Sequence, residues 1–177
     1  MWTLRAFNAM DAADAVRVLT ACCASQSWAE KVATGRPYGT VASLKAAALA
    51  AFDELDDAEL AVAHAAHPPI GKPRPAEGAD WSRGEQSRAL ASAEAVRAEL
   101  AEVNAAYEHR FGRVFLICAT GLTGEEILAE ARRRLAGDDR AEAAASVAEL
   151  RKITALRLDK SFGAGPAATA PGTEVRP

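Results

Sequence analysis

Apolar residues recur at steps of three and four along most of the chain, the spacing that gathers them on one face of an α-helix. From Asp11 they continue to Cys23, a shorter stretch surrounds Trp28, and a longer one follows Thr40. Another begins at Asp56 and cannot continue past His67, because Pro68 disfavours helical backbone in the residue before it. The pattern predicts helices over 11–23, around 28–32, and over 40–55, 56–67, 82–111 and 123–135. A last helix follows the break at Gly137-Asp138-Asp139 and runs through Leu158.

Breaks between these helices carry turn and capping residues. Gly35 to Gly39 predicts a turn around Pro37, and Ser82 with Glu85 has the spacing of a capping box. Residues 68–80 hold four prolines and two glycines, which predicts a long loop of the kind that often serves function.

The apolar run 114–119 does not alternate and is too short for a core helix, so we expect an extended or tightly wound buried segment. Residues 163–177 show no periodicity, which predicts a disordered Gly/Pro/Ala tail after a domain over 1–162. Alanine accounts for 44 of the 177 residues and aromatic side chains for 6%, a composition that favours helices over sheets. The expected fold is an all-α, single-domain bundle of several helices with no substantial sheet.

Charge, hydropathy and cysteine content indicate which partners and which cellular compartment the protein can have. A net charge of −3 offers no basic patch for nucleic acid. No run is apolar and long enough to cross a membrane, and the N-terminus lacks the pattern of an export signal. Cys22, Cys23 and Cys118 are an odd number with two adjacent, which favours reduced thiols. We therefore expect a soluble, cytoplasmic protein without nucleic-acid or membrane partners.

His67 is the first candidate for chemistry. It falls at a predicted helix C-terminus, where the helix dipole favours an imidazolium, and it borders the proline loop, so it could exchange a proton. The alternative is an ordinary capping or solvated histidine. His64 and His67 could share a helix face, but zinc needs a third ligand, such as Glu85, and no second paired motif exists. We predict no metal.

Other polar candidates have two interpretations each. Ser82 and Glu85 could merely cap a helix, or that helix N-terminus could face a bound anion while Glu85 works beside His67. Gln86 offers an amide for polar atoms, and Arg157 could either pair at the surface or grip a carboxylate or ureido oxygen with its fork. The cysteines read as structural.

Four motifs in order carry a family resemblance. They are His67-Pro68-Pro69-Ile70-Gly71; Trp81-Ser82-x-x-Glu85-Gln86; Asn104-x-x-Tyr107-x-x-x-Phe111-Gly112-x-x-Phe115-x-Ile117-Cys118-Ala119; and Lys152-Ile153-x-x-Leu156-Arg157-Leu158. Together they resemble the 2-oxo-4-hydroxy-4-carboxy-5-ureidoimidazoline (OHCU) decarboxylases of urate breakdown, over about residues 5–160. Pro69 and His109 depart from the residues common in that family.

The resemblance implies an all-helical homodimer that needs no cofactor and acts as a carboxy-lyase, converting OHCU to (S)-allantoin. It places catalytic roles on His67 and Glu85. The substrate-binding positions that it implies are Pro68, Ser82, Arg83, Gly84, Gln86, the backbone of Phe115, Leu116, Ile117, Cys118 and Ala119, and Arg157.

The chemistry agrees with the absence of a cofactor. Loss of CO2 leaves an electron pair on a ring carbon, and the adjoining carbonyl and C=N groups of OHCU can accept it. The protein then has to position the substrate and move protons. Two alternatives stay open: a helical binding module without catalysis, and a lyase for a related ureido acid.

Overall fold

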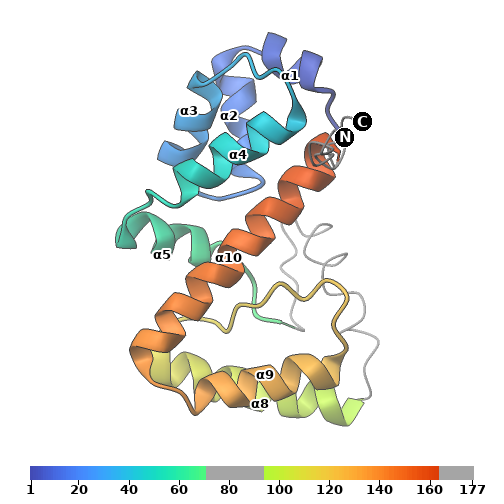
Figure 1. Ribbon diagram of the computed structural model, residues 1–177. Coiled ribbons are helices and arrows are strands. Elements are labelled where there is room, and N and C mark those ends of the chain that lie inside the picture. Colours follow the sequence, from blue (N-terminus) through green and yellow to red (C-terminus); the bar gives the residue numbers. More distant parts are fainter. Residues whose placement is uncertain (71–93, 164–177) are drawn as a thin grey trace, which may run out of the picture.

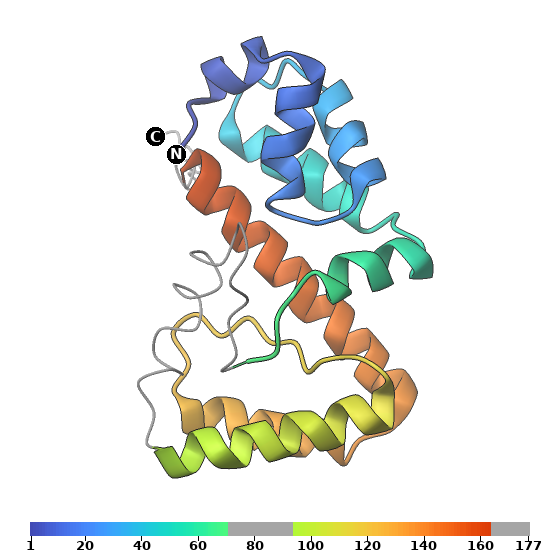
Figure 2. The same ribbon diagram turned by 180° about the vertical axis from the view of Figure 1, so that it is seen from behind.

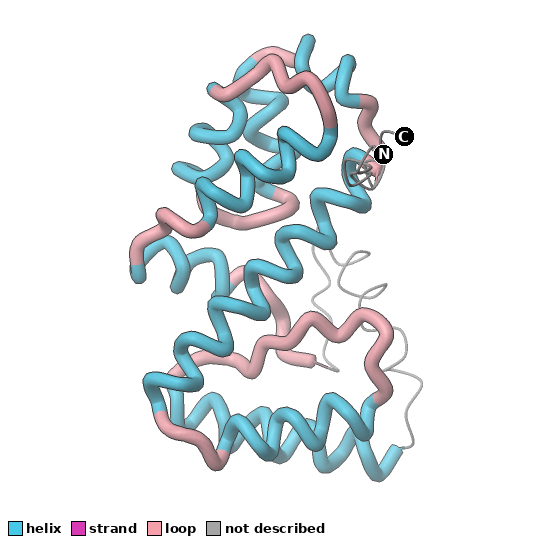
Figure 3. Tube along the Cα trace, viewed as in Figure 1, coloured by secondary structure: helices cyan, strands magenta, loops and turns pink. Residues whose placement is uncertain are grey.

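The computed structural model describes residues 1–70 and 94–163, and within these ranges the chain is helical, with no strand (Figures 1 and 3). The helices are α1 (Leu4–Ala9), α2 (Ala12–Thr20), α3 (Gln26–Thr34), α4 (Val41–Phe52), α5 (Asp57–Ala65), α8 (Glu94–Phe111), α9 (Gly124–Leu135) and α10 (Asp139–Phe162). The all-α prediction is confirmed.

The first four helices form a bundle against the C-terminal half of α10 (Figure 2). Its core includes Trp28, whose indole N–H donates to the Ala48 carbonyl at 2.8 Å, so the ring is buried with its polar atom paired. The rings of Phe7 and Phe162 meet edge to face, 4.9 Å apart. The bundle therefore holds the last turns of α10 in place.

A second core lies between α8, α9 and the connection 112–123 that joins them. Helices α8 and α9 run side by side at the end of the molecule opposite the N-terminal bundle (Figures 1 and 2). Gly112 and Gly121 have φ values of 67° and 88°, a region that side chains with a Cβ rarely adopt. These two glycines bracket the extended segment that passes through the second core.

Helix α10 spans both cores. Its 24 residues give a length of about 36 Å at about 1.5 Å per residue. It starts beside the α8–α9 pair and ends at the N-terminal bundle, where the Trp2 N–H donates to the Ser161 carbonyl at 2.6 Å (Figure 1). One face of α10 is therefore available to several distant segments.

Most predicted boundaries agree with the structure. Asp11, Asp56 and Thr123 are N-caps, Thr40 caps α4 with Ser43 completing the box, and Thr123 and Glu126 form the predicted capping box. Residues 114–119 are extended, and most of them are buried. One detail was wrong, since α4 ends at Phe52 rather than Leu55. Helix α10 begins at Asp139, at the predicted break between the last two helices.

The short helix α1 was not predicted. Three expectations concern residues that the structure does not describe. The Ser82–Glu85 capping box, most of the proline loop and the tail beyond 163 lie outside the described residues. No helix in the described part of the chain is long and apolar enough to cross a membrane.

A buried ion pair joins the second core to α10. Arg134 on α9 donates from Nε to Glu142 on α10 at 2.8 Å, and both side chains are almost fully buried. Tyr107 on α8 also donates its hydroxyl to Glu142, and the Arg134 guanidinium lies 4.7 Å over the Phe115 ring. Burial alone would raise the pKa of Glu142, but the hydrogen bonds from Arg134 and Tyr107 outweigh it and lower the pKa.

We predict that Arg134→Met lowers the free energy of unfolding by about 3–5 kcal/mol, because it leaves the Glu142 carboxylate buried without its cation. Urea unfolding of the purified protein measures the loss. Arg133→Met is the matched control, since Arg133 is exposed and pairs with Glu130 at the surface. Equal unfolding midpoints for the two variants would contradict a structural role for the buried pair.

Candidate active site

A pocket forms where the end of α5 meets the connection between α8 and α9. In both ribbon views the chain after α5 and the 112–123 segment run side by side between α10 and the α8–α9 pair (Figures 1 and 2). The described residues that line the pocket come from these two segments and from α10: His67, Pro68, Ile70, Leu116, Ile117, Cys118, Ala119, Thr120, Ile153 and Leu156.

The two ring nitrogens of His67 differ: Nδ1 forms a hydrogen bond to the backbone, whereas Nε2 faces the pocket without one to the described residues. Its Nδ1 lies 2.9 Å from the carbonyl oxygen of Ala63, one turn earlier. A carbonyl only accepts, so Nδ1 carries the proton and Nε2 keeps a lone pair. Nε2 is buried and has no hydrogen-bond partner among the described residues. The ring therefore presents an unprotonated nitrogen at the pocket.

Burial and, after it, the positive charge of Arg157 lower the pKa of His67 to about 4, whereas the Ala63 hydrogen bond acts in the opposite direction. The prediction that the helix end would favour an imidazolium is therefore wrong. The side chain is only 6% exposed, and the loss of hydration outweighs the dipole. Near neutral pH His67 is a neutral base.

Arg157 lies one helical turn beyond Ile153 on α10 and is half-buried. It is not among the residues that line the pocket, but its charge acts on both His67 and Cys23. Arg157 is therefore placed to act as a cation behind the pocket wall, rather than only to form an ion pair at the surface.

Two side chains hold the 116–118 backbone in shape. Arg134 donates from Nη1 to the Leu116 carbonyl at 2.8 Å, and the Cys118 N–H donates to Glu149 on α10 at 2.8 Å. The Cys118 N–H is therefore already paired, so this amide does not meet the expectation that the segment's backbone N–H groups face a substrate. Glu149 was not predicted to have a role at the site, because nothing in the sequence around it distinguishes it from a surface glutamate.

The structure brings together His67, Pro68, Leu116, Ile117, Cys118 and Ala119 from the predicted set. Phe115 does not line the pocket, because its ring packs edge to face against Tyr107, 5.4 Å away. The other predicted positions, Ser82, Arg83, Gly84, Glu85 and Gln86, lie outside the described residues.

Four lining residues were not predicted as site residues: Ile70, Thr120, Ile153 and Leu156. Ile153 lies three residues before Leu156 and four before Arg157, which places it beside both on the helix surface, and this spacing was a usable signal. Ile70 follows the two prolines directly, whereas Thr120 reaches the pocket through the course of the extended segment. Hydrophobic side chains thus form most of the wall.

His64 faces a different neighbourhood from the one considered for metal. Burial lowers its pKa to about 4, with further lowering by Arg113 and Arg134. Two guanidinium groups beside an imidazole are a poor environment for a cation. Among the described residues no group of three His, Cys, Asp or Glu side chains is placed to hold a metal ion.

Comparison with known proteins gives a consistent result. A family model described as OHCU decarboxylase matches residues 8–159. The 2-oxo-4-hydroxy-4-carboxy-5-ureidoimidazoline decarboxylase of Amia calva is 34% identical over 136 residues, which are 73% of this chain and 77% of that protein.

Two longer relatives match as well. The uric acid degradation bifunctional protein TTL of Arabidopsis thaliana is 35% identical over 80% of this chain and 45% of its own length. The uric acid degradation bifunctional protein of Bacillus sp. (strain TB-90) is 27% identical over 93% of this chain and 33% of its own. The chain thus spans less than half the length of these two relatives.

Among solved structures, an OHCU decarboxylase crystallised in the presence of (S)-allantoin superimposes with a TM-score of 0.71 and 31% identity, covering 82% of this chain and 96% of that one. An (S)-allantoin synthase structure gives a TM-score of 0.68 at 17% identity, covering 91% of this chain and 54% of that one, a likeness of fold alone.

We predict that the imidazole of His67 stays neutral to well below pH 6.5, which NMR of ¹⁵N-histidine-labelled protein measures. The unfolded chain takes up this proton near pH 6.5 and the folded chain near 4, so the unfolded state binds more protons between these values. The free energy of unfolding should fall by about 3 kcal/mol on this account as the pH drops through that window. His67→Gln should remove this part of the loss, and an Nε2 signal that titrates near pH 6.5 would refute the assignment.

Proposed function

Because the chain belongs to the OHCU decarboxylase family, we propose that it is a carboxy-lyase of urate degradation that converts OHCU to (S)-allantoin. The observation that carries the proposal is His67, a neutral base in a mainly apolar pocket whose Nε2 has no hydrogen-bond partner in the described part of the chain. It occupies the position where the family resemblance places the catalytic histidine.

The reaction can be written with its electrons balanced. The bond between the ring carbon and the carboxylate breaks, CO2 leaves, and the electron pair moves toward the neighbouring C=N group of the substrate, whose nitrogen takes up a proton. The hydroxyl then loses its proton while a proton is added to the carbon that bears the ureido group. Because the substrate accepts the electron pair itself, the chemistry requires no cofactor.

His67 suits the proton step. Nε2 can accept the hydroxyl proton, and the hydrogen bond from Nδ1 to Ala63 holds the ring while it does so. The imidazolium that forms would be acidic, since burial and Arg157 disfavour it, and so it would return a proton readily. We assign Glu85, outside the described residues, the partner role in placing the new proton on one face.

The pocket wall favours loss of the carboxylate. Ile70, Ile117 and Leu156 provide an apolar surface on which a localised negative charge is poorly solvated, whereas CO2 is neutral. Arg157 would balance the charge of the bound substrate and grip a carboxylate or ureido oxygen. Pro68 and the 116–119 segment would shape the remaining wall, and Ser82 to Gln86, outside the described residues, would contribute further substrate contacts.

We also propose a cytoplasmic homodimer. Within the described residues the three cysteines form no disulfide, and burial raises the pKa of Cys23, which supports a structural role in a reducing compartment. The dimer rests on the family resemblance, and sedimentation velocity of the purified chain tests it.

We predict that His67→Ala slows the decay of freshly generated OHCU by about 10²- to 10⁴-fold in kcat/KM, since it removes the general base. Circular dichroism follows the appearance and handedness of allantoin. His109→Ala is the matched control, because His109 is exposed on α8. Wild-type protein that leaves spontaneous decay unchanged would identify a binding module, and His67→Ala protein that makes optically pure (S)-allantoin at the full rate would overturn the assignment.

We predict that Arg157→Met raises KM and moves the acidic limb of kcat/KM to higher pH, because Arg157 both attracts the anionic substrate and lowers the pKa of His67. A pH–rate profile separates the two effects. Arg151→Met serves as control, since Arg151 lies on the same helix but pairs with Asp53 at the surface. A lower rate with an unshifted acidic limb would show that Arg157 does not act on His67.

A further inference from the structure

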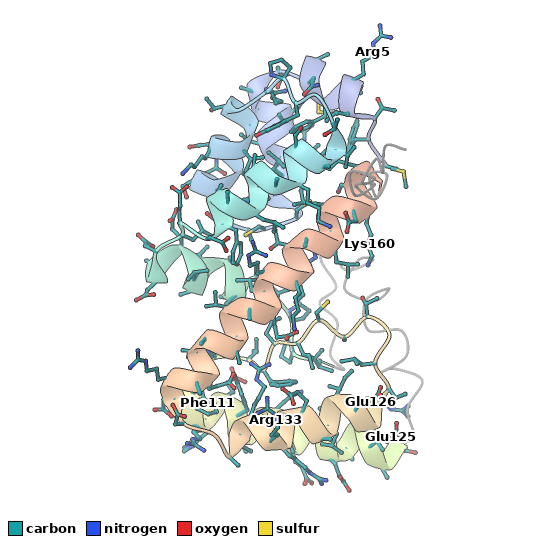
Figure 4. The ribbon with its side chains drawn as sticks, in the orientation of Figure 1. Arg5, Phe111, Glu125, Glu126, Arg133 and Lys160 are labelled. Atoms are coloured by element: carbon teal, nitrogen blue, oxygen red, sulfur yellow. The ribbon has the colours of Figure 1, made fainter. Side chains whose placement is uncertain are left out.

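A second cavity lies nearer the start of α10, between α5 and the turn that follows α8. Figure 4 labels Phe111, which marks this end of α8. Many of the described residues that line the cavity are apolar, among them Leu60, Phe111, Val114, Val147 and Leu150. Its polar side chains include His64, Arg113 and Ser146, from three different elements, and His67, which also lines the first pocket.

These three polar side chains have buried atoms without partners. Nε and Nη2 of Arg113, Nε2 of His64 and the hydroxyl of Ser146 have no hydrogen-bond partner among the described residues. Ser146 is 3% exposed and His64 is 8% exposed, so water does not replace the missing partners at the surface. Polar atoms buried in this way are rare in folded proteins and mark sites that take a ligand or an ion.

The unpartnered edge of Arg113 identifies the ligand chemistry. Nε and Nη2 carry parallel N–H groups on one side of the guanidinium, and this pair matches the two oxygens of a planar carboxylate. Ser146 can add a hydroxyl donor. His64 is neutral near pH 7, because burial and Arg113 lower its pKa, and a neutral imidazole can donate from one nitrogen.

The charges around the cavity favour the binding of one anion, because the carboxylates near Arg113 do not neutralise it. Glu142, the nearest buried carboxylate, is already bound by Arg134 and Tyr107. Asp57 and Glu108 also line the cavity, but both are exposed, so water screens their charges. The guanidinium of Arg113 is therefore the charge that a ligand would meet on entering.

We propose that this cavity binds a small aliphatic monocarboxylate, with the carboxylate on the Arg113 edge, Ser146 and His64 and the hydrocarbon part on Leu60, Val147 and Leu150. The cavity borders the pocket of the proposed reaction, because His67 lines both, but the contacts proposed for this ligand come from Arg113, Ser146 and His64. It uses residues to which the family resemblance assigns no role.

Butyrate is the probe, and titration calorimetry with the full chain measures its binding. We expect saturable binding that Arg113→Met weakens at least about tenfold, the loss typical of a charged hydrogen bond. Ser146→Ala should weaken it a few-fold. Arg5→Met should bind as wild type, because Arg5 is exposed on α1 and points away from the body of the protein (Figure 4).

Further ligands make the test specific. Butyramide, which has the same shape without the charge, should bind at least about tenfold more weakly than butyrate, and inorganic phosphate should bind more weakly than butyrate. Equal affinity for butyrate in Arg113→Met protein, or phosphate binding tighter than butyrate, would overturn the proposal.

Two measurements guard against a variant that fails to fold. Butyrate should shift the ¹⁵N signals of His64 in the wild-type protein, and unchanged signals at saturating butyrate would contradict the assignment. If butyrate does not bind and Arg113→Met instead changes the oligomeric state in sedimentation, the cavity belongs to an interface between copies and the proposal is wrong.

Discussion

The ion pair between Arg134 and Glu142 is the interaction on which the packing of α8, α9 and the 112–123 connection against α10 depends. It joins α9 to α10, takes a hydrogen bond from Tyr107 on α8, and through Arg134 also holds the Leu116 carbonyl. A buried pair of this kind tolerates little displacement, since either charge alone would be buried without compensation. The extended segment that forms one wall of the His67 pocket is therefore fixed by charges that never enter the pocket.

The same segment is tied to α10 a second time, through Glu149 and the Cys118 N–H. Helix α10 thus carries both Ile153 and Leu156, which line the pocket, and Glu149, which holds the facing backbone. Its other end is anchored in the N-terminal bundle by Phe162 and by the backbone contact from Ser161 to Trp2. One long helix connects the stability of the bundle to the geometry of the site, which explains why much of the N-terminal half serves as support.

Local signals in the sequence predicted much of this arrangement. Thr123 with Glu126 predicted the start of α9, and Pro68 predicted that α5 ends close to His67. The run 114–119, which does not alternate, was predicted to be buried and either extended or tightly wound. The same signals failed where the answer depended on distant contacts. The charge state of His67 was predicted from its helix end, but burial by segments remote in sequence reverses it. Likewise, nothing local distinguishes Arg134 from the exposed Arg132 and Arg133 beside it.

By itself, the sequence determined that the chain is helical, where most helices begin, and which motifs resemble the OHCU decarboxylases, because capping, periodicity and proline act within a few residues. Tertiary structure decided which polar groups lose water. It buried His67 and so made it a neutral base, and it paired Arg134 with Glu142. It also left Arg113, His64 and Ser146 around one cavity with buried atoms that have no partner among the described residues. Desolvation depends on everything that surrounds a group in space, and no stretch of neighbouring residues contains that information.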